Sequence, residues 1–267
     1  MDDVYENLDR PPLSARALDR ALAPDGWRIE VLSTAGSTNA VVAARARDGE
    51  PAGLVVVAEQ QTAGRGRLAR SWVSPPRAGL TLSVLLRPDL PAARWPWLPL
   101  WGGLAVARAL RERAGVETAL KWPNDVLIGD RKVCGVLAEV PVPGALVLGV
   151  GLNVSTRADE LPHAGATSLL LEHATTTDRD TVLRAVLRSL TAVLREQPVE
   201  GYRALCSTIG RQVRVELPGG RSVVGPAEGV DDAGRLVVAG QVYSVGDVVH
   251  VRPGPPALRP RADPGGV

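Results

Sequence analysis

The chain has 267 residues, of which 45% are hydrophobic and 22% are charged. This is the composition of a soluble globular protein, long enough for one large domain or for a catalytic domain with a small appendage. Its 31 basic and 29 acidic side chains leave a formal charge of only +2. So small a charge excludes a protein that binds nucleic acid or membranes over its whole surface, and any recognition of an anion must therefore be local.

Targeting and redox signals are weak. No stretch approaches the roughly 18 apolar residues that a membrane span requires, and the start Met1-Asp2-Asp3 is unlike a signal peptide, so we expect a cytoplasmic protein. Cys134, Cys206 and the three histidines have no metal-ligand spacing. We therefore expect reduced packing thiols and surface histidines.

The first third of the chain is predicted to alternate helices with strands. Capping residues and hydrophobic spacing predict helices over 14–22 and 37–47 and strands over 27–32, 54–58 and 80–86. A long loop, rich in Gly, Arg, Ser and Pro, is predicted over 61–79. Only about thirty residues precede the first motif, too few for a helix-turn-helix module, so we expect no specific DNA binding.

The middle of the chain predicts the rest of a sheet and its covering helices. Helices are expected over 97–114 and 179–196, and strands over 117–122, 126–129, 132–140 and 145–153. The predicted fold class is α+β, with a mixed sheet flanked by helices.

The residue pattern changes after Gly210, where Val213, Val215 and Leu217 alternate with polar residues and sequences typical of turns follow. This pattern predicts a small antiparallel barrel. The predicted domains are an N-terminal extension over 1–26, a catalytic domain over 27–208, an all-β domain over 209–252 and a disordered, proline-rich tail over 253–267.

Lysine usage singles out two positions. Of the 31 basic residues 29 are Arg, and the two lysines, Lys121 and Lys132, lie within one twelve-residue segment. A chain so biased toward Arg keeps Lys where a compact ammonium cannot be exchanged for a planar guanidinium. Both lysines are therefore candidate functional residues.

The strongest local signal is the segment from Gln61 to Arg70, QTAGRGRLAR. Its glycines permit close backbone approach, and its arginines offer paired donors to a phosphate or carboxylate. Five arginines and no acidic residue lie between 60 and 88. A flexible basic loop is the alternative, and neither a Walker loop nor a dinucleotide fingerprint fits.

A second signal is KWPND at 121–125, a strand-ending turn with a cation, an aromatic ring, an amide and a carboxylate. Its Asn can read an adenine edge, and its Trp can cover a ring or a hydrocarbon chain. The alternative is a simple turn with Trp122 in the core. Lys132 and the segment GVGLN at 149–153, a strand with backbone space and a terminal amide, are weaker signals on their own.

In this order the motifs closely resemble those of the biotin protein ligases. They are Ser-Thr-Asn at 37–39, the Gly-Arg-Gly-Arg loop QTAGRGR at 61–67, KWPND at 121–125, Lys132 and GVGLN at 149–153. The resemblance spans about residues 27–252, because the family appends an SH3-like barrel to its catalytic domain. It implies a class II synthetase-like catalytic fold of the monofunctional type, without an N-terminal DNA-binding domain.

The resemblance implies a ligase reaction in two steps. The carboxylate of biotin attacks the α-phosphate of ATP to form biotinyl-5'-AMP, and pyrophosphate leaves. A lysine of a biotin carboxyl carrier protein domain, part of an acyl-CoA carboxylase such as acetyl-CoA carboxylase, then takes the biotinyl group. Two anions must meet in the first step, so cations and Mg²⁺ are needed. We expect ATP to hold the Mg²⁺ and assign no protein ligand to it.

The resemblance also implies roles for individual residues. Lys132 would bridge the two oxyanions, helped by Arg65 and Arg67, and these three are the candidate catalytic residues. The candidate biotin-binding residues are Ser37, Thr38, Asn39, Gln61, Arg65, Gly66, Arg67, Trp122, Lys132 and Gly135. The candidate ATP- or adenylate-binding residues are Arg67, Arg70, Trp72, Lys121, Asn124, Asp125, Lys132 and Asn153.

Some of these roles are more specific. Trp122 would line the apolar body of biotin, Trp72 would stack on adenine, and Asp125 would orient Lys132 or a metal. Asn124 and Asn153 would contact adenine or phosphate. The Gly-Arg loop should be mobile without ligand, because its like charges repel and it buries little apolar surface.

Two other functions remain open, a lipoate or octanoate ligase of the same fold and a non-catalytic biotin sensor or repressor. The expected partners are biotin, ATP and the carrier domain, with no membrane and no specific DNA, and a monomer is favoured. The C-terminal barrel is either a structural cap or a part of ATP closure or acceptor docking.

Overall fold

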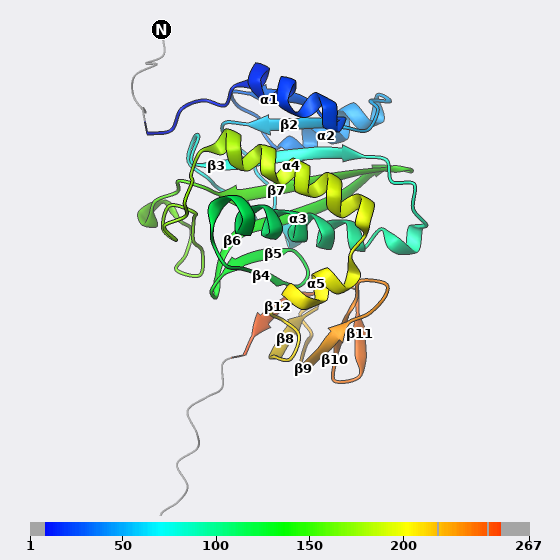
Figure 1. The fold of residues 1–267 in the computed structure, drawn as a ribbon. Helices are drawn as coiled ribbons and strands as arrows, with labels where there is room; N and C mark the ends of the chain where they lie inside the picture. Colours follow the sequence, from blue (N-terminus) through cyan, green and yellow to red (C-terminus); the bar gives the residue numbers. More distant parts are fainter. Residues whose placement is uncertain (1–8, 218, 245, 252–267) are drawn as a thin grey trace, which may run out of the picture.

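The computed structural model describes residues 9–217, 219–244 and 246–251. Its larger unit is built on a seven-stranded sheet of order β1-β2-β3-β7-β6-β5-β4 (Figure 1). The strands are β1 (Arg28–Leu32), β2 (Leu54–Ala58), β3 (Gly79–Leu86), β4 (Thr118–Lys121), β5 (Asp125–Ile128), β6 (Arg131–Val142) and β7 (Ala145–Asn153). β1 and β2 pair in parallel and the other neighbours pair antiparallel, so the sheet is mixed, as predicted.

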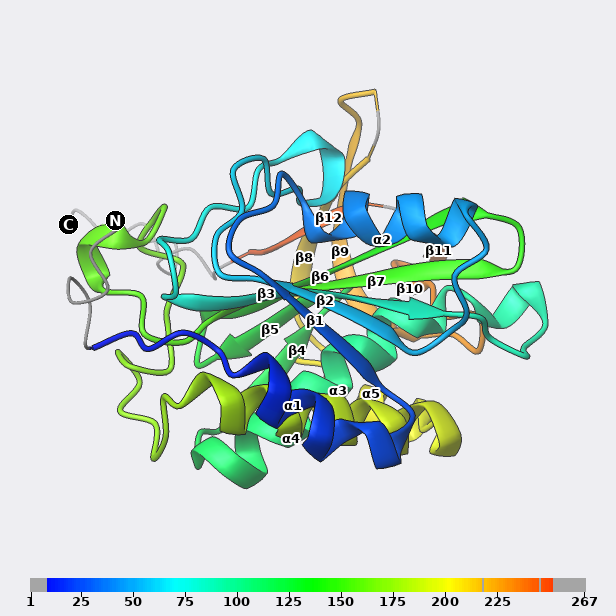
Figure 2. The same ribbon diagram turned by 90° about the horizontal axis from the view of Figure 1, so that it is seen from above.

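Helices cover both faces of this sheet. Figure 2 shows α1, α3 and α4 on one side and α2 on the other. Their bounds are α1 (Ala15–Leu22), α2 (Thr38–Arg47), α3 (Trp97–Ala114), α4 (Arg179–Glu196) and α5 (Val199–Leu205). The predicted helices all form, whereas α5 was not predicted because seven residues are too few for a clear helical period.

The central strands are buried because helices cover them from both sides. Every residue of β2 and β3 is buried, which explains their nearly continuous apolar sequence. On the α3 side, Trp97 and Trp101 stack with ring centroids 5.8 Å apart, and Tyr202 of α5 meets Trp97 edge-on. The large core therefore lies between the sheet and α3, α4 and α5.

The C-terminal residues form a five-stranded antiparallel sheet of order β11-β10-β9-β8-β12. Its strands are β8 (Gln212–Glu216), β9 (Ser222–Val230), β10 (Leu236–Val238), β11 (Gln241–Tyr243) and β12 (Asp247–His250). Val213 and Val215 are buried and the residues between them are exposed, as the alternation predicted. The sheet sits beside α5 and β4, as Figure 1 shows.

One continuous hydrophobic cluster joins the two sheets. Indole N–H groups also cross the junction: Trp97 donates to the Asp232 carbonyl (2.8 Å) and Trp122 to the Gly234 carbonyl (3.0 Å). Helix α1 belongs to the same core through Leu18 and Leu22. The predicted domain limits at 26 and 208 therefore stay a proposal, and the predicted tail over 253–267 lies outside the described residues.

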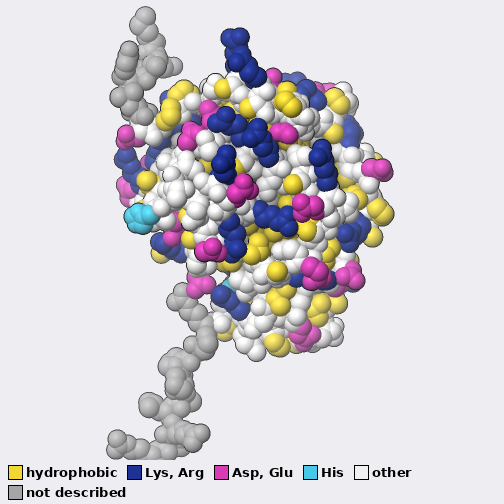
Figure 3. Space-filling model, viewed as in Figure 1, with side chains coloured by type: hydrophobic (Ala, Val, Ile, Leu, Met, Phe, Trp, Pro, Cys, Tyr) yellow, Lys and Arg dark blue, Asp and Glu magenta, His cyan; other side chains and the backbone are white. Residues whose placement is uncertain are grey.

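Basic and acidic side chains are interspersed on the face of the molecule that carries α3 and α4 (Figure 3), as a formal charge of +2 leads one to expect. None of the described helices is long and apolar enough to cross a membrane. Cys134 and Cys206 are free and buried, and burial raises the pKa of both thiols, which suits the predicted packing role. Of the histidines, His163 and His173 are exposed and His250 is half-buried.

Candidate active site

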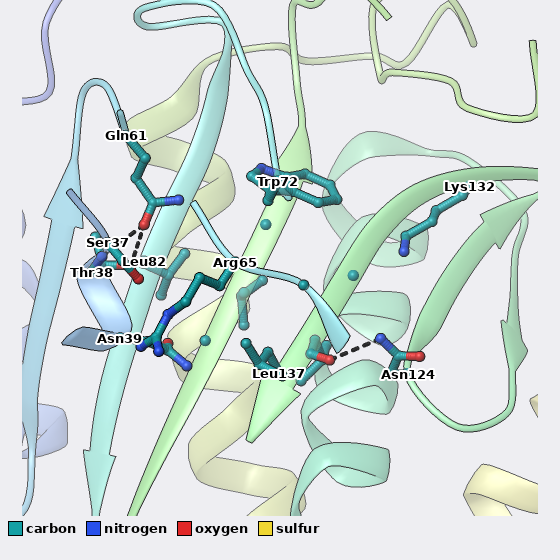
Figure 4. A pocket seen from close by; sticks show the side chains of 16 residues that line it. Ser37, Thr38, Asn39, Gln61, Arg65, Trp72, Leu82, Asn124, Lys132 and Leu137 are labelled. Carbon is teal, nitrogen blue, oxygen red and sulfur yellow. Dashed lines mark hydrogen bonds between the residues drawn. The ribbon is translucent and has the colours of Figure 1, made fainter. Parts of the chain in front are cut away.

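A cavity of about 450 Å³, its mouth included, lies beside α2, where the 61–79 loop passes over β3, β6 and β7 (Figure 4). It brings together residues of all five sequence motifs with residues of the central strands. The lining residues are Ser37, Thr38, Asn39, Gln61, Arg65, Gly66, Trp72, Leu82, Asn124, Lys132, Gly135, Val136, Leu137, Gly149, Val150 and Gly151.

One end of the cavity is a polar wall, which we define as the lining residues Thr38, Asn39 and Gln61 together with Ser83, a fully buried residue that does not itself line the cavity. The Thr38 backbone N–H donates to Gln61 Oε1 (2.7 Å), and the Thr38 hydroxyl lies 3.0 Å from the same oxygen. The Ser83 hydroxyl lies 2.8 Å from Thr38 Oγ1 and 2.6 Å from Asn39 Oδ1. Asn39 Nδ2 in turn donates to Glu139 Oε2 (2.6 Å). The wall is thus held by neutral groups and one carboxylate.

Local structure explains why these groups face the cavity. Ser37 is the N-cap of α2, but its side chain makes no capping hydrogen bond within the described residues, so its hydroxyl remains available at the cavity surface. Gly149 of β7 makes room for Asn39, because a Cβ there would overlap Asn39 Oδ1. A Cβ at Gly151 would lie 2.5 Å from the Trp72 ring. The glycines of GVGLN therefore supply the backbone space that the sequence indicated.

The other end of the cavity is cationic. Lys132 Nζ lies 2.6 Å from Asp125 Oδ1 and 5.8 Å from the centre of the Trp72 ring. Trp72 Nε1 is buried and has no hydrogen-bond partner in the described part of the chain. Arg65 Nη2 lies 3.2 Å from Glu139 Oε2, the oxygen to which Asn39 also donates, so its guanidinium lies on the wall side of Lys132 (Figure 4). A ligand with a neutral polar group at one end and a negative charge at the other fits this division.

Two more loop arginines lie behind this end. Arg67 Nη1 donates to Asn124 Oδ1 (3.5 Å). Burial lowers the pKa of Arg67, an effect opposed by Asp247 and Asp125, and a guanidinium stays charged at neutral pH. Arg70 pairs with Asp247 at the start of β12. The C-terminal sheet therefore contacts the loop that covers the cavity.

The ends of the loop are anchored although its middle is exposed. Glu59, just after β2, forms a 2.6 Å ion pair with Arg179 of α4, and both side chains are less than a tenth exposed. Arg179 also donates to the carbonyl of Gly79, where β3 begins (3.4 Å). Between these anchors the side chains of Arg65 and Arg70 are 48% and 64% exposed.

The comparisons with known proteins agree with this geometry. Residues 34–155 match the Biotin/lipoate A/B protein ligase family, and residues 208–251 match the Biotin protein ligase C terminal domain. The chain is 48% identical over 261 residues to the biotin–[acetyl-CoA-carboxylase] ligase of Mycobacterium tuberculosis (strain ATCC 25618 / H37Rv), covering 91% of this chain and 97% of that protein. The chain belongs to the biotin protein ligase family.

Two further relatives support the ligase assignment. The biotin protein ligase from Aquifex aeolicus in complex with biotin and ATP superposes with a TM-score of 0.71 at 30% identity, covering 84% of this chain and 99% of that one. The bifunctional ligase/repressor BirA of Escherichia coli (strain K12) is 31% identical over 226 residues, 80% of this chain and 70% of that protein. The predicted α+β fold with a C-terminal β domain is confirmed.

The cavity of this ligase collects most of the residues that the sequence singled out. Their individual roles stay predictions, but their side chains or backbones share one cavity although they come from five separate segments. The predicted residues that line it are Ser37, Thr38, Asn39, Gln61, Arg65, Gly66, Trp72, Asn124, Lys132 and Gly135.

The structure contradicts the predicted position of Trp122. Its side chain is 1% exposed and does not line the cavity, because it points into the core at the junction with the C-terminal sheet and donates to the Gly234 carbonyl. The alternative interpretation of KWPND, a turn with Trp122 in the core, is correct for this residue. Leu82, Leu137 and Val150 form the apolar lining instead.

Five other predicted residues lie outside the lining. Arg67 and Asp125 contact lining residues, and Arg70 lies at the contact with β12. Lys121 lies near His250 and helps to lower the pKa of that ring. Asn153 is buried, and its Nδ2 donates to the Thr167 carbonyl (2.9 Å), so its amide holds the end of β7.

Sequence reasoning missed Ser83 and Glu139. Each stands out as a polar residue inside a strand that is otherwise largely apolar, GLTLSVLL for β3 and RKVCGVLAEVPV for β6. That contrast is the signal that could have identified them. Their partners, however, come from α2, which no local pattern indicates.

Proposed function

We propose that this ligase activates biotin with ATP to give biotinyl-5'-AMP and pyrophosphate. It then transfers the biotinyl group to a specific lysine of a biotin carboxyl carrier protein domain of a carboxylase. The observation that carries the proposal is a single cavity with a polar wall at Thr38 and Asn39 at one end and the Lys132 ammonium at the other, while the Arg65 guanidinium pairs with Glu139 beside the wall. Biotin has a neutral ureido ring at one end and a carboxylate at the other, and so fits both.

Binding would place each part of biotin against matching chemistry. The hydroxyl and amide groups of Ser37, Thr38, Asn39 and Gln61 would bond the ureido ring. The aliphatic lining from β3, β6 and β7 would cover the apolar body. The carboxylate would then reach the cationic end. Site residues and roles are part of the proposal.

In the first step a carboxylate oxygen of biotin bonds to the α-phosphorus of ATP, and the bond from that phosphorus to the pyrophosphate oxygen breaks. Negative charge from two anions gathers at one point. The Lys132 ammonium, with Arg65 and Arg67, would stabilise this charge, because cations held in place before the reaction need no reorganisation. Asp125, 2.6 Å away, would hold the ammonium in position.

In the second step the amine of the acceptor lysine attacks the acyl carbon of the adenylate. A C–N bond forms, the C–O bond to AMP breaks so that AMP leaves, and the proton of the amine passes to solvent. The Gly-Arg loop would cover the mixed anhydride until the carrier domain arrives, which slows its hydrolysis.

The residues present do not form a metal cage. Across 9–217, 219–244 and 246–251, no group of three or more His, Cys, Asp or Glu side chains is placed to hold a metal ion. The nearby Asp125 is paired with Lys132. We therefore propose that Mg²⁺ arrives on the phosphates of ATP, where it would neutralise charge, and we assign it no protein ligand.

The proposal extends to partners and location. We expect a cytoplasmic monomer that binds no specific DNA duplex, since neither charge nor composition favours a large anionic partner. Sedimentation tests whether the protein is a monomer. Fluorescence anisotropy with an operator-length duplex in physiological salt tests for specific DNA binding, and nanomolar binding would overturn this expectation.

The experiment that tests the proposal is biotin-dependent exchange of labelled pyrophosphate into ATP, with lipoate as the control acid. Wild type should exchange with biotin alone, and Lys132→Ala should lose about 100- to 1000-fold in rate, the scale for removing one donor to a developing oxyanion. Arg108→Ala removes an exposed cation paired with Glu196, outside the cavity, and should exchange like wild type.

Each other outcome has a meaning. Exchange with lipoate in place of biotin would support the lipoate or octanoate ligase. No exchange with either acid, from folded protein that binds biotin, would point to a sensor. Lys121→Ala is informative as well: a raised KM for ATP would support the predicted ATP contact, and an unchanged KM would support a place at the junction of the two sheets.

A further inference from the structure

Glu139 is a carboxylate at the polar wall for which the proposed reaction has no use. It lies on β6, and its Oε2 accepts from Asn39 Nδ2 at 2.6 Å. At the other end of the same amide, the Ser83 hydroxyl lies 2.6 Å from Asn39 Oδ1. A carboxylate paired with Arg65 accepts hydrogen bonds and donates none. If the Asn39 amide were reversed, its Oδ1 would face Glu139 Oε2, and two acceptors would lie together with no proton between them. Glu139 therefore fixes the direction in which the Asn39 N–H groups point.

The fixed amide also directs the hydroxyl protons of the wall. Three oxygen–oxygen contacts, of 2.6, 2.8 and 3.0 Å, link Asn39 to Ser83, Ser83 to Thr38 and Thr38 to Gln61, but the two hydroxyls have only two protons. Ser83 must donate to Asn39 Oδ1, because that oxygen has no proton of its own.

The Thr38 hydroxyl can donate to Gln61 Oε1, which also accepts from the Thr38 backbone N–H at 2.7 Å, or to Ser83 Oγ. In both cases Ser83 has no second proton to give to Thr38 Oγ1. Thr38 Oγ1 therefore receives no proton from the wall and faces the cavity as an acceptor. Asn39 and Gln61 keep N–H groups that can donate to a ligand.

We infer that Glu139 is a positioning residue that sets the donor and acceptor pattern of the polar wall, and with it the selectivity for a cyclic urea. A cyclic urea has a carbonyl oxygen between two N–H groups, so it needs donors beside an acceptor, which is what this wall offers. The inference rests on the proposed function. It adds a carboxylate that acts through Asn39, Ser83 and Thr38.

The test compares equilibrium binding of biotin with that of 2-iminobiotin, in which an N–H group replaces the ureido oxygen, without ATP. Wild type should prefer biotin strongly. In Glu139→Gln the new amide can donate to Asn39 Oδ1, so Asn39 can turn over and offer its oxygen to the ligand. We expect about a tenfold loss of biotin affinity, the scale of one hydrogen bond to a charged group, and a preference for biotin at least about threefold lower.

Further variants separate the effect from other causes. Glu139→Asp stays an acceptor and should lose affinity while keeping the preference. Ser83→Ala leaves the contact of Arg65 with Glu139 intact and should lose about tenfold in biotin affinity. Glu50→Gln removes a comparably exposed carboxylate, paired with Arg28 outside the cavity, and should change neither quantity.

Two outcomes would overturn the inference. One is a Glu139→Gln protein with the wild-type preference. The other is an Arg65→Ala protein that reproduces the change of preference, since the lost ion pair would then be its cause. If Glu139→Gln does not fold, an unchanged affinity in Ser83→Ala refutes the inference and a tenfold loss supports it. Failure of the proposed function would show in wild type itself, as binding without pyrophosphate exchange or as no biotin binding.

Discussion

The polar wall of the cavity and the loop that covers the cavity are built by different means. At the polar wall, Thr38, Asn39 and Ser83 are at most 5% exposed, and hydrogen bonds of 2.6 to 2.8 Å between helix α2 and strand β3 connect them. In the 61–79 loop over the cavity, the side chains of Arg65 and Arg70 are about half exposed or more and are held by ion pairs with carboxylates.

This difference indicates which part of the site has its final shape before a ligand binds and which part does not. A buried hydrogen-bonded wall has a set shape, because any group that loses its partner is left unsatisfied at a cost of about 1 to 3 kcal/mol. Exposed ion pairs contribute about 0 to 1 kcal/mol each, so ligand oxyanions can replace their carboxylates easily. Recognition of the ring should therefore precede closure over the anions.

The largest expected effect is at the polar wall. Gly149→Ala places a Cβ on Asn39 Oδ1, so the amide must move and break its bonds to Ser83 and Glu139. We expect biotin affinity, measured by equilibrium titration, to fall by at least about 100-fold, the equivalent of one to two buried hydrogen bonds. Gly36→Ala, where nothing lies within 4 Å, is the control. Unchanged affinity in Gly149→Ala would mean that the wall is adaptable after all.

The second expectation concerns the loop over the cavity. Trypsin should cut the ligand-free protein readily between Arg65 and Arg70, and saturating biotin plus ATP should slow this cleavage by about tenfold or more as the loop orders. Cleavage after the exposed Arg221, in the turn between β8 and β9, is the internal reference and should not change. Equal rates at the loop with and without ligands would refute ligand-induced closure.

A smaller effect is expected where the C-terminal sheet contacts the loop. Asp247→Asn removes the partner of Arg70 and should speed trypsin cleavage of the ligand-free loop by up to about fivefold, since an exposed pair contributes at most about 1 kcal/mol. Glu117→Gln, which removes the partner of Arg111 on α3, should leave cleavage unchanged. No change in Asp247→Asn would favour a purely structural role for the C-terminal sheet.

The smallest effect concerns pH at the junction of the two sheets. Burial, with smaller contributions from Lys121 and Arg211, lowers the pKa of His250 to about 4, although Asp130 opposes this. Arg211 donates to Nδ1 (3.2 Å) and Nε2 lies 3.2 Å from Thr208 Oγ1, contacts that suit a neutral ring. A folded-state pKa below the ordinary 6.5 gives stability that is present above about pH 6.5 and is lost as the pH falls toward 4.

The check is thermal unfolding of wild type and His250→Gln at pH 7 and pH 5. Wild type should lose more stability on acidification, by less than about 1 kcal/mol because the ring is only half-buried. Equal losses of stability in the two proteins would mean that protonation of His250 does not weaken this junction.

Much of the fold follows from local patterns. Helices α3 and α4 begin and end where hydrophobic spacing placed them, and β7 does the same, because a long apolar period is set by which face of an element is buried. The motif residues of 37–39, Gln61, Arg65, Gly66 and Lys132 share one cavity for a similar reason. Hydroxyls, amides and cations are rarely placed together at strand and helix ends without a ligand to bind.

The tertiary structure alone decided which neighbours these residues have. KWPND indicated a functional turn, yet only the packing of the C-terminal sheet shows that Trp122 belongs to the core. Asn39 and Glu139 are a hundred residues apart in the chain, and they meet because α2 packs across β3, β7 and β6. A sequence pattern records the side on which a residue is buried. It carries no record of the partner, which depends on strand order and register.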